Sequence, residues 1–314
     1  MTTVMVRDPV PTPLEDAEAI RKSVQGWGTD EKGLIEVLAH RNAEQRQVIR
    51  LAYEEHYQEH LIKRLESELY GDFEKATYRW ILEPVERDAT LANAALKNNA
   101  LPDYPVLIET ACVKSPDEFL VVKRAYQWRY KRSLEEDIAS HTTGDFHKLL
   151  FALASAYKYD GLEINAPLAK SESDILWKLI EKKSYNDEEL IRILTTRSNA
   201  QLNATFNMFK DEHHISITKS LLEDPANEFL AALRTVIRCI SNPTKYFVKV
   251  LRKAIHHPGT DEDSLTRVIV THAEKDLKVI KEKYYERENV TLEDAIAKET
   301  SGHYKAFLLA LLGN

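Results

Sequence analysis

Apolar residues recur along the chain at the three- and four-residue spacing that gathers them on one face of an α-helix. Leu34, Ile35 and Leu38 form one such stripe, and Val48 with Ile49 belongs to the next. Strand-like alternation of apolar and polar residues does not occur, so the pattern predicts an all-α protein. The helix-breaking positions early in the chain are Gly28, Asn42, Tyr57 and Gly71. They divide this part into about five short helices, which must bury their apolar faces against one another.

The same pattern of segments occurs four times, and such repetition decides the fold prediction. "GTDEKGLIEVLAHRNAEQRQVI" from Gly28 aligns with "GTDEDSLTRVIVTHAEKDLKVI" from Gly259, 231 residues later. Segments similar to the one at Leu34 begin at Leu107 and Leu190, and "SELYGDFEK" at Ser67 has counterparts at the same three offsets. The predicted repeats span 14–83, 86–157, 168–240 and 244–313, after a tail of 1–13 and with a connector at 158–167. A generic helical solenoid would show the same periodicity.

Composition limits the classes of function. The 314 residues, 43% of them hydrophobic, are enough for a large core. The formal net charge of −7 argues against a general nucleic-acid binder, which would need Lys and Arg to neutralise phosphates. Only two cysteines and no apolar run of signal-peptide length indicate a reduced, cytoplasmic protein. No uninterrupted run of about 18 apolar residues is present, so any membrane contact is expected to be peripheral.

The "GWGT" segment, residues 26–29, combines two glycines in one turn. Glycine tolerates positive φ, so such a loop can aim successive carbonyl oxygens at one point. Calcium accepts backbone carbonyls together with a bidentate carboxylate. An acid follows both of the most similar loops at one spacing, because 38 residues separate Thr29 from Glu68 and Thr260 from Glu299. The predicted calcium ligands are Val24, Gly26, Gly28 and Glu68 in the first repeat, and Ile255, His257, Gly259 and Glu299 in the fourth.

A G-x-G-T loop, 38 residues and then an acid, set in four repeats, resembles the annexin family over essentially the whole chain and is most similar to plant annexins. The resemblance implies a slightly curved, four-repeat α-helical disc that binds acidic phospholipid through calcium on its convex face. The physics is consistent with this, because an acidic protein and an anionic bilayer repel each other. Loop-bound calcium with open coordination positions would bridge the protein to lipid phosphates.

Trp27 lies between the predicted carbonyl ligands of the first loop. Indole side chains prefer the bilayer interface, so Trp27 is predicted to project from the loop as a membrane anchor. The alternative is that Trp27 packs on a neighbouring loop.

The other repeats depart from the first. In the fourth, His257 replaces the first glycine and Pro258 stands at the tryptophan position, so His257 is expected to adopt a geometry that glycine takes more easily. The second repeat has "ALPDY" in place of the loop and His141 in place of the acid. The third keeps Asp224 but has "KKSYND" without a glycine. We therefore predict calcium sites of this type only in the first and fourth repeats, and loss of the Glu68 carboxylate is expected to weaken binding more than loss of Glu299. The alternative for the fourth repeat is a vestigial loop in which Glu299 is only solvated.

The resemblance also suggests weaker alternatives. His40 matches a histidine linked to haem peroxidase activity in plant annexins, although it follows an apolar helical run and packing is favoured. Cys112 and Cys239 match a proposed redox cluster, for which two buried thiols are the favoured interpretation. The "IRI" triplet at residues 191–193 resembles an F-actin motif, but it continues an apolar helix stripe. A calcium-conducting membrane pathway is a further alternative. No catalytic residue is predicted.

Overall fold

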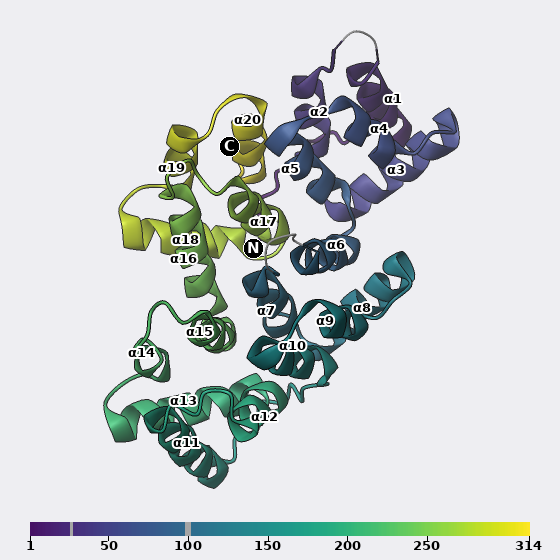
Figure 1. The fold of residues 1–314 in the computed structure, drawn as a ribbon. Coiled ribbons are helices and arrows are strands. Elements are labelled where there is room, and N and C mark those ends of the chain that lie inside the picture. The colour runs from purple at the N-terminus through teal and green to yellow at the C-terminus, as the bar shows by residue number, and fades with distance from the viewer. Residues whose placement is uncertain (26–27, 98–101) are drawn as a thin grey trace. The chain divides into compact units, whose positions relative to one another are not determined.

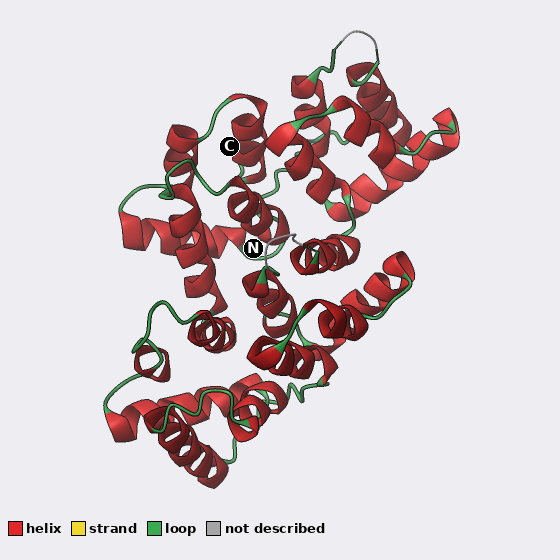
Figure 2. Cartoon of the chain, in the orientation of Figure 1, coloured by secondary structure: helices red, strands yellow, loops and turns green. Residues whose placement is uncertain are grey.

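The computed structural model describes residues 1–25, 28–97 and 102–314. Every regular element in these ranges is an α-helix, and Figure 2 shows only helices and loops. The helices follow one another as four sets of five, α1–α5, α6–α10, α11–α15 and α16–α20 (Figure 1). The all-α prediction is confirmed. None of the described helices has both the length and the apolar character needed to cross a bilayer.

The first compact unit comprises residues 1–87 and 247–314, so it joins the first and last parts of the chain. Its helices are α1(Pro13–Ser23), α2(Glu31–Leu38), α3(Ala43–Tyr57), α4(Leu61–Glu68), α5(Gly71–Ile81), α17(Glu262–His272), α18(Leu277–Glu288), α19(Leu292–Glu299) and α20(Gly302–Leu311). Helix α5 packs against α17 and α20, and α2 packs against α20. Trp80 of α5 is fully buried, and its indole Nε1 donates a hydrogen bond to the carbonyl of Leu38 at 2.7 Å. Helices far apart in sequence therefore share one core.

The second compact unit comprises residues 88–246. Its helices are α7(Tyr104–Cys112), α8(Pro116–Tyr130), α9(Leu134–His141), α10(Gly144–Ser155), α11(Ala166–Glu181), α12(Glu188–Thr196), α13(Asn199–His213), α14(Ile217–Ser220) and α15(Glu228–Ser241). Helix α7 packs against α10 and α15, and α11 packs against α13. The chain passes between the two units within α6(Pro84–Leu96) and α16(Pro243–Ile255).

A buried or half-buried charge pair recurs at one place in three repeats. The pairs are Asp16–Arg41 with its shortest contact at 2.6 Å, Asp88–Lys114 at 2.6 Å and Glu172–Arg197 at 2.7 Å. At the positions in the fourth repeat that correspond to Asp16 and Arg41, Phe247 and His272 pack with ring centroids 4.1 Å apart. The repeats thus share a fold but have different kinds of side chains at this contact.

The tail at residues 1–13 lies along the first unit. The Thr3 amide donates to the carbonyl of Ala273 at 2.8 Å, and the Thr3 hydroxyl donates to the carbonyl of Leu311 at 2.6 Å. Further along, the carbonyl of Met5 accepts a hydrogen bond from Nδ1 of His40 at 2.9 Å. The tail therefore contacts both the fourth and the first repeat.

Candidate calcium sites

Each candidate site forms where two helices end. Val24 caps the C-terminus of α1, and Glu68 is the last residue of α4. In the fourth repeat Ile255 ends α16 and Glu299 ends α19. The last carbonyls of a helix lack intrahelical partners and carry partial negative charge, so they attract cations. Two helix C-termini and a carboxylate at one place favour a cation on electrostatic grounds alone.

The threonine of the G-x-G-T pattern holds the loop to the helix that carries the acid. Thr29 donates its hydroxyl hydrogen to the backbone carbonyl of Glu68, with an oxygen–oxygen distance of 3.2 Å. Thr260 does the same toward Glu299 at 3.4 Å. In the sequence this threonine served only to measure the spacing. The structure shows a contact for it: the threonine hydroxyl ties the loop to the end of the helix that carries the acid.

Both glycines at the end of the loops lie in the left-handed region. Gly28 has φ +92° and Gly259 has φ +89°. A Cβ at either position would meet no heavy atom within 4 Å, so backbone conformation and not lack of space requires glycine there. Gly26 and Trp27 lie outside the described residues, and their predicted roles remain predictions.

The fourth loop is a tight turn in which proline has a clear role. The amide of Thr260 donates to the carbonyl of His257 at 2.9 Å, Pro258 follows His257, and Gly259 has positive φ. This is the arrangement of a type II turn, which favours proline and then glycine at its two central positions. His257 is not among the residues with positive φ, so the strain expected there is absent. Its carbonyl keeps a second lone pair for a cation.

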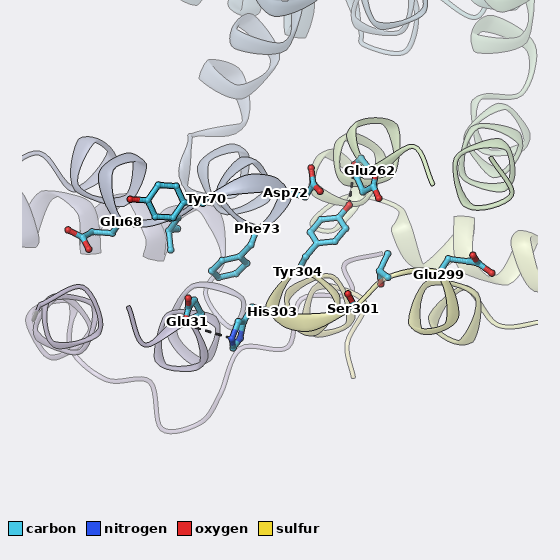
Figure 3. Close-up of a pocket in the computed structure, with 12 residues that line it drawn as sticks. Glu31, Glu68, Tyr70, Asp72, Phe73, Glu262, Glu299, Ser301, His303 and Tyr304 are labelled. Carbon is cyan, nitrogen blue, oxygen red and sulfur yellow. Dashed lines mark hydrogen bonds and ion pairs between the residues drawn. The ribbon is translucent and has the colours of Figure 1, made fainter. Parts of the chain in front are cut away.

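The two acids line one pocket of the first unit, with a volume of about 390 Å³. Figure 3 shows Glu68 and Glu299 at its opposite ends. Glu31, Asp72 and Glu262 also line it, and His303 lies 3.8 Å from a carboxylate oxygen of Glu31. The two acids therefore flank a pocket lined by further carboxylates, an arrangement whose negative charge favours cations. Sequence reasoning did not assign these three further acids, although Glu31 and Glu262 end the repeated "GTDE" segment.

In the first repeat, one cationic group already bridges the predicted ligands. Nη2 of Arg64 donates to the carbonyl of Val24 at 2.6 Å and lies 3.1 Å from Oε1 of Glu68. The carbonyl and the carboxylate therefore converge on a single positively charged nitrogen. Two oxygens placed in this way, one of them anionic, fit the oxygen chemistry that calcium requires.

The corresponding parts of the middle repeats have other partners. Nδ1 of His141 lies 2.8 Å from the carbonyl of Asp137, one helical turn earlier. A carboxylate oxygen of Asp224 accepts a hydrogen bond from the amide of Ala226 at 3.1 Å. In the "KKSYND" segment Lys183 has φ +56°, and its Nζ lies 2.7 Å from Oε1 of Glu223. Asp224 is therefore used in a local turn.

The cysteines and the "IRI" triplet belong to the second unit. Cys112 and Cys239 are both buried, on the packed helices α7 and α15. Burial raises the pKa of the Cys112 thiol to about 11, which disfavours the reactive thiolate. Ile191 and Ile193 are buried, whereas Arg192 pairs with Glu189. The packing interpretation of these isoleucines and of the thiols is confirmed. Actin binding stays the alternative interpretation of the triplet.

His40 follows α2 in the first unit. Its Nδ1 pairs with the Met5 carbonyl, and since a carbonyl only accepts, this nitrogen carries the hydrogen. The remaining nitrogen, Nε2, is the one that an axial haem bond would need. The contact ties His40 to the N-terminal tail, which agrees with the packing role favoured from the sequence.

These features define an all-helical protein of four five-helix repeats, with a loop and an acid brought together in the first and fourth. The protein-family model for annexins matches residues 15–79, 87–153, 171–235 and 246–311. The chain belongs to the annexin family.

Similar proteins cover the chain from end to end. It is 63% identical over 299 residues to annexin-like protein RJ4 of Fragaria ananassa, with 95% of each chain covered. It is 51% identical to annexin D7 of Arabidopsis thaliana, over 100% of this chain and 99% of that protein. The solved structure of chicken annexin V matches with a TM-score of 0.91 at 32% identity, over 100% of this chain and 99% of that one. The expected resemblance to plant annexins is confirmed, and the family is known for calcium-dependent phospholipid binding.

Proposed function

We propose that this protein docks reversibly on acidic phospholipid membranes through calcium held in the first and fourth loops. The observation that carries the proposal is the convergence of the Val24 carbonyl and the Glu68 carboxylate on one cationic nitrogen. The net charge of −7 adds a second argument, because docking on an anionic surface then needs a cation as intermediary.

The proposed ligands are backbone carbonyls of the loops and one carboxylate in each repeat. They are Val24, Gly26, Gly28 and Glu68 in the first repeat, and Ile255, His257, Gly259 and Glu299 in the fourth. Thr29 and Thr260 hold the loops to the backbone of the two acids. Calcium held there would supply open coordination positions for phosphate oxygens of the lipid. The protein's part is to place these oxygens in advance and to leave one side of each site open.

Sedimentation with phosphatidylserine vesicles across a calcium titration tests the proposal. The protein is expected to pellet with the vesicles as calcium rises and to return to the supernatant when a chelator is added. Lipid should also raise the apparent calcium affinity by the factor by which calcium raises lipid affinity, because the coupling is reciprocal. Pelleting that ignores calcium would contradict the mechanism.

Loss of the first site is expected to weaken membrane binding more than loss of the fourth. Glu68→Gln removes the carboxylate next to the loop that contains Trp27. Calcium binding at this loop is then lost, and with it the docking that brings the proposed Trp27 anchor to the membrane. Glu299→Gln affects a loop with proline at the corresponding position. The lipid concentration at half-binding in saturating calcium should rise further for Glu68→Gln. Equal effects, or a larger one for Glu299→Gln, would reverse this ranking.

Trp27→Ala is expected to raise the lipid concentration at half-binding about tenfold, because an indole at the interface contributes on the order of 1.4 kcal/mol. Calcium dependence should persist, since the carbonyl ligands are backbone atoms. Trp128 is the matched control, because its side chain on α8 is 70% exposed but far in sequence from either loop. Vesicle sedimentation at fixed calcium compares the two. An equal loss in Trp128→Ala would mean that Trp27 is not a specific anchor.

A further inference from the structure

Arg64 precedes Glu68 by one helical turn of α4, so the two side chains lie on the same helix face. The Arg64 guanidinium also reaches across to the carbonyl at the end of α1. The Arg64 and Glu68 side chains are only 26% and 24% exposed. A charge-assisted hydrogen bond with this much burial is stronger than a surface ion pair, so Arg64 is a substantial partner for both oxygens.

We propose that Arg64 is a built-in competitor of calcium at the first site. It holds the Val24 carbonyl and the Glu68 carboxylate when calcium is absent, and it must release both before calcium can use them. This inference rests on the proposed function, and it adds a regulation of the same site. The calcium affinity of the first loop is then set by the strength of an internal contact as well as by the ligands themselves.

A second partner is available to Arg64 when it leaves the site. Nη1 of Arg64 lies 3.9 Å from Oε1 of Glu59. The other carboxylate oxygen of Glu59 pairs with Arg21 and accepts a hydrogen bond from the hydroxyl of Tyr53 at 3.1 Å. The guanidinium can therefore move toward Glu59 without losing all its ionic contacts. This lowers the free-energy cost of releasing the two oxygens, so the contact weakens calcium binding without preventing it.

The competitor is specific to the first repeat. The positions that correspond to Arg64 in the later repeats are Asp137, Ser220 and Ala295. In the fourth repeat the one ion pair of the Glu299 carboxylate among the described residues is a longer contact to its neighbour Lys298, at 3.9 Å with the lysine side chain 81% exposed. The fourth site can therefore bind calcium without displacing a half-buried cation such as Arg64. The two sites should respond to calcium in sequence, the fourth before the first.

The inference is tested by calorimetric titration of the full-length protein with calcium chloride alone. The protein carries Glu299→Gln, which disables the fourth site, so the heat of binding reports calcium binding at the first site. Arg64→Ala in this background should tighten calcium binding about tenfold, because a charge-assisted hydrogen bond and an ion pair no longer oppose it. Lys63→Ala is the matched control: it removes the same charge from an exposed neighbour on α4. Its effect should stay below about twofold, as expected for an exposed charge.

Thermal unfolding gives a second readout. Without calcium, Arg64→Ala should unfold as a cooperative protein, and at one fixed calcium concentration its melting temperature should rise more than that of the parent. If the parent binds calcium and Arg64→Ala binds it no tighter, or more weakly, the inference is overturned and Arg64 is a strut that positions the loop. If no variant binds calcium, the proposed function fails at this loop together with the inference.

Discussion

Replacement of Glu68 and Glu299 together by glutamine is expected to abolish calcium-dependent sedimentation with phosphatidylserine vesicles. Each glutamate is the only predicted carboxylate ligand of its site, and each is the last residue of a helix whose end meets the loop. Glutamine keeps the shape of the side chain but removes its negative charge. The backbone carbonyls that remain cannot compensate, because calcium affinity depends strongly on the charge of the ligands.

The loss of calcium affinity in this double variant should be large. Replacing even an outer-shell partner of a metal ligand typically costs 10–100-fold in affinity, so losing the only charged ligand should raise the calcium requirement by more than about 100-fold at each site. With both sites changed, the double variant should stay in the supernatant over the calcium range that sediments the unchanged protein. Circular dichroism before the assay should show an unchanged helical spectrum, since neither side chain is in the core.

Asp224→Asn provides the matched control. Asp224 is the acid of the third repeat, but no glycine loop accompanies it, and its carboxylate accepts the amide of Ala226. Asparagine can accept the same hydrogen bond. Sedimentation of Asp224→Asn should therefore match that of the unchanged protein. The assignment of calcium sites to the first and fourth repeats is wrong if the double variant still sediments with calcium. It is also wrong if Asp224→Asn no longer sediments.

The helical fold could be predicted because its signals are local and repeated. Helical spacing of apolar residues and caps such as Asn42, which begins α3 with a capping box, are readable from short segments. Four copies in one register then reinforced each weak signal. The recurring charge pairs were not predicted, because Asp16 and Arg41 are brought together by packing between helices and are 25 residues apart.

The candidate sites could be predicted only in part. The spacing between loop and acid was visible in the sequence. The Pro258–Gly259 dipeptide was visible too, and it favours the turn that the fourth loop forms, although His257 replaces the first glycine there. The spacing of Arg64 and Glu68 was also present in the sequence. What the sequence did not show is that Arg64 reaches Val24, because this contact depends on where α4 lies against the end of α1.

The largest loss of stability is expected for Asp16→Ala. Asp16 and Arg41 form a two-point contact at 2.6 and 2.8 Å, and each side chain is 4% exposed. Removing the carboxylate leaves Arg41 buried without a counter-charge, and breaking such a pair typically costs about 3–5 kcal/mol. The melting temperature of the full-length protein should fall by roughly 10 °C. Thermal unfolding followed by circular dichroism measures the shift.

Glu36→Ala is the control for this change. Glu36 pairs with Arg7, but both side chains are more than half exposed, so its loss should cost at most about 1 kcal/mol. If Asp16→Ala destabilises the protein no more than Glu36→Ala does, the buried Asp16–Arg41 pair contributes no more to stability than an exposed ion pair.

The fourth repeat indicates where the cost arises. Phe247 and His272 stand at the positions of Asp16 and Arg41, so the fold accepts an aromatic contact where the first repeat has charges. The double variant Asp16→Phe, Arg41→His should therefore recover much of the stability that Asp16→Ala loses. Recovery would show that the expected loss reflects an unpaired buried arginine more than the net strength of the ion pair. A double variant as unstable as the single one would instead assign the loss to the ion pair itself.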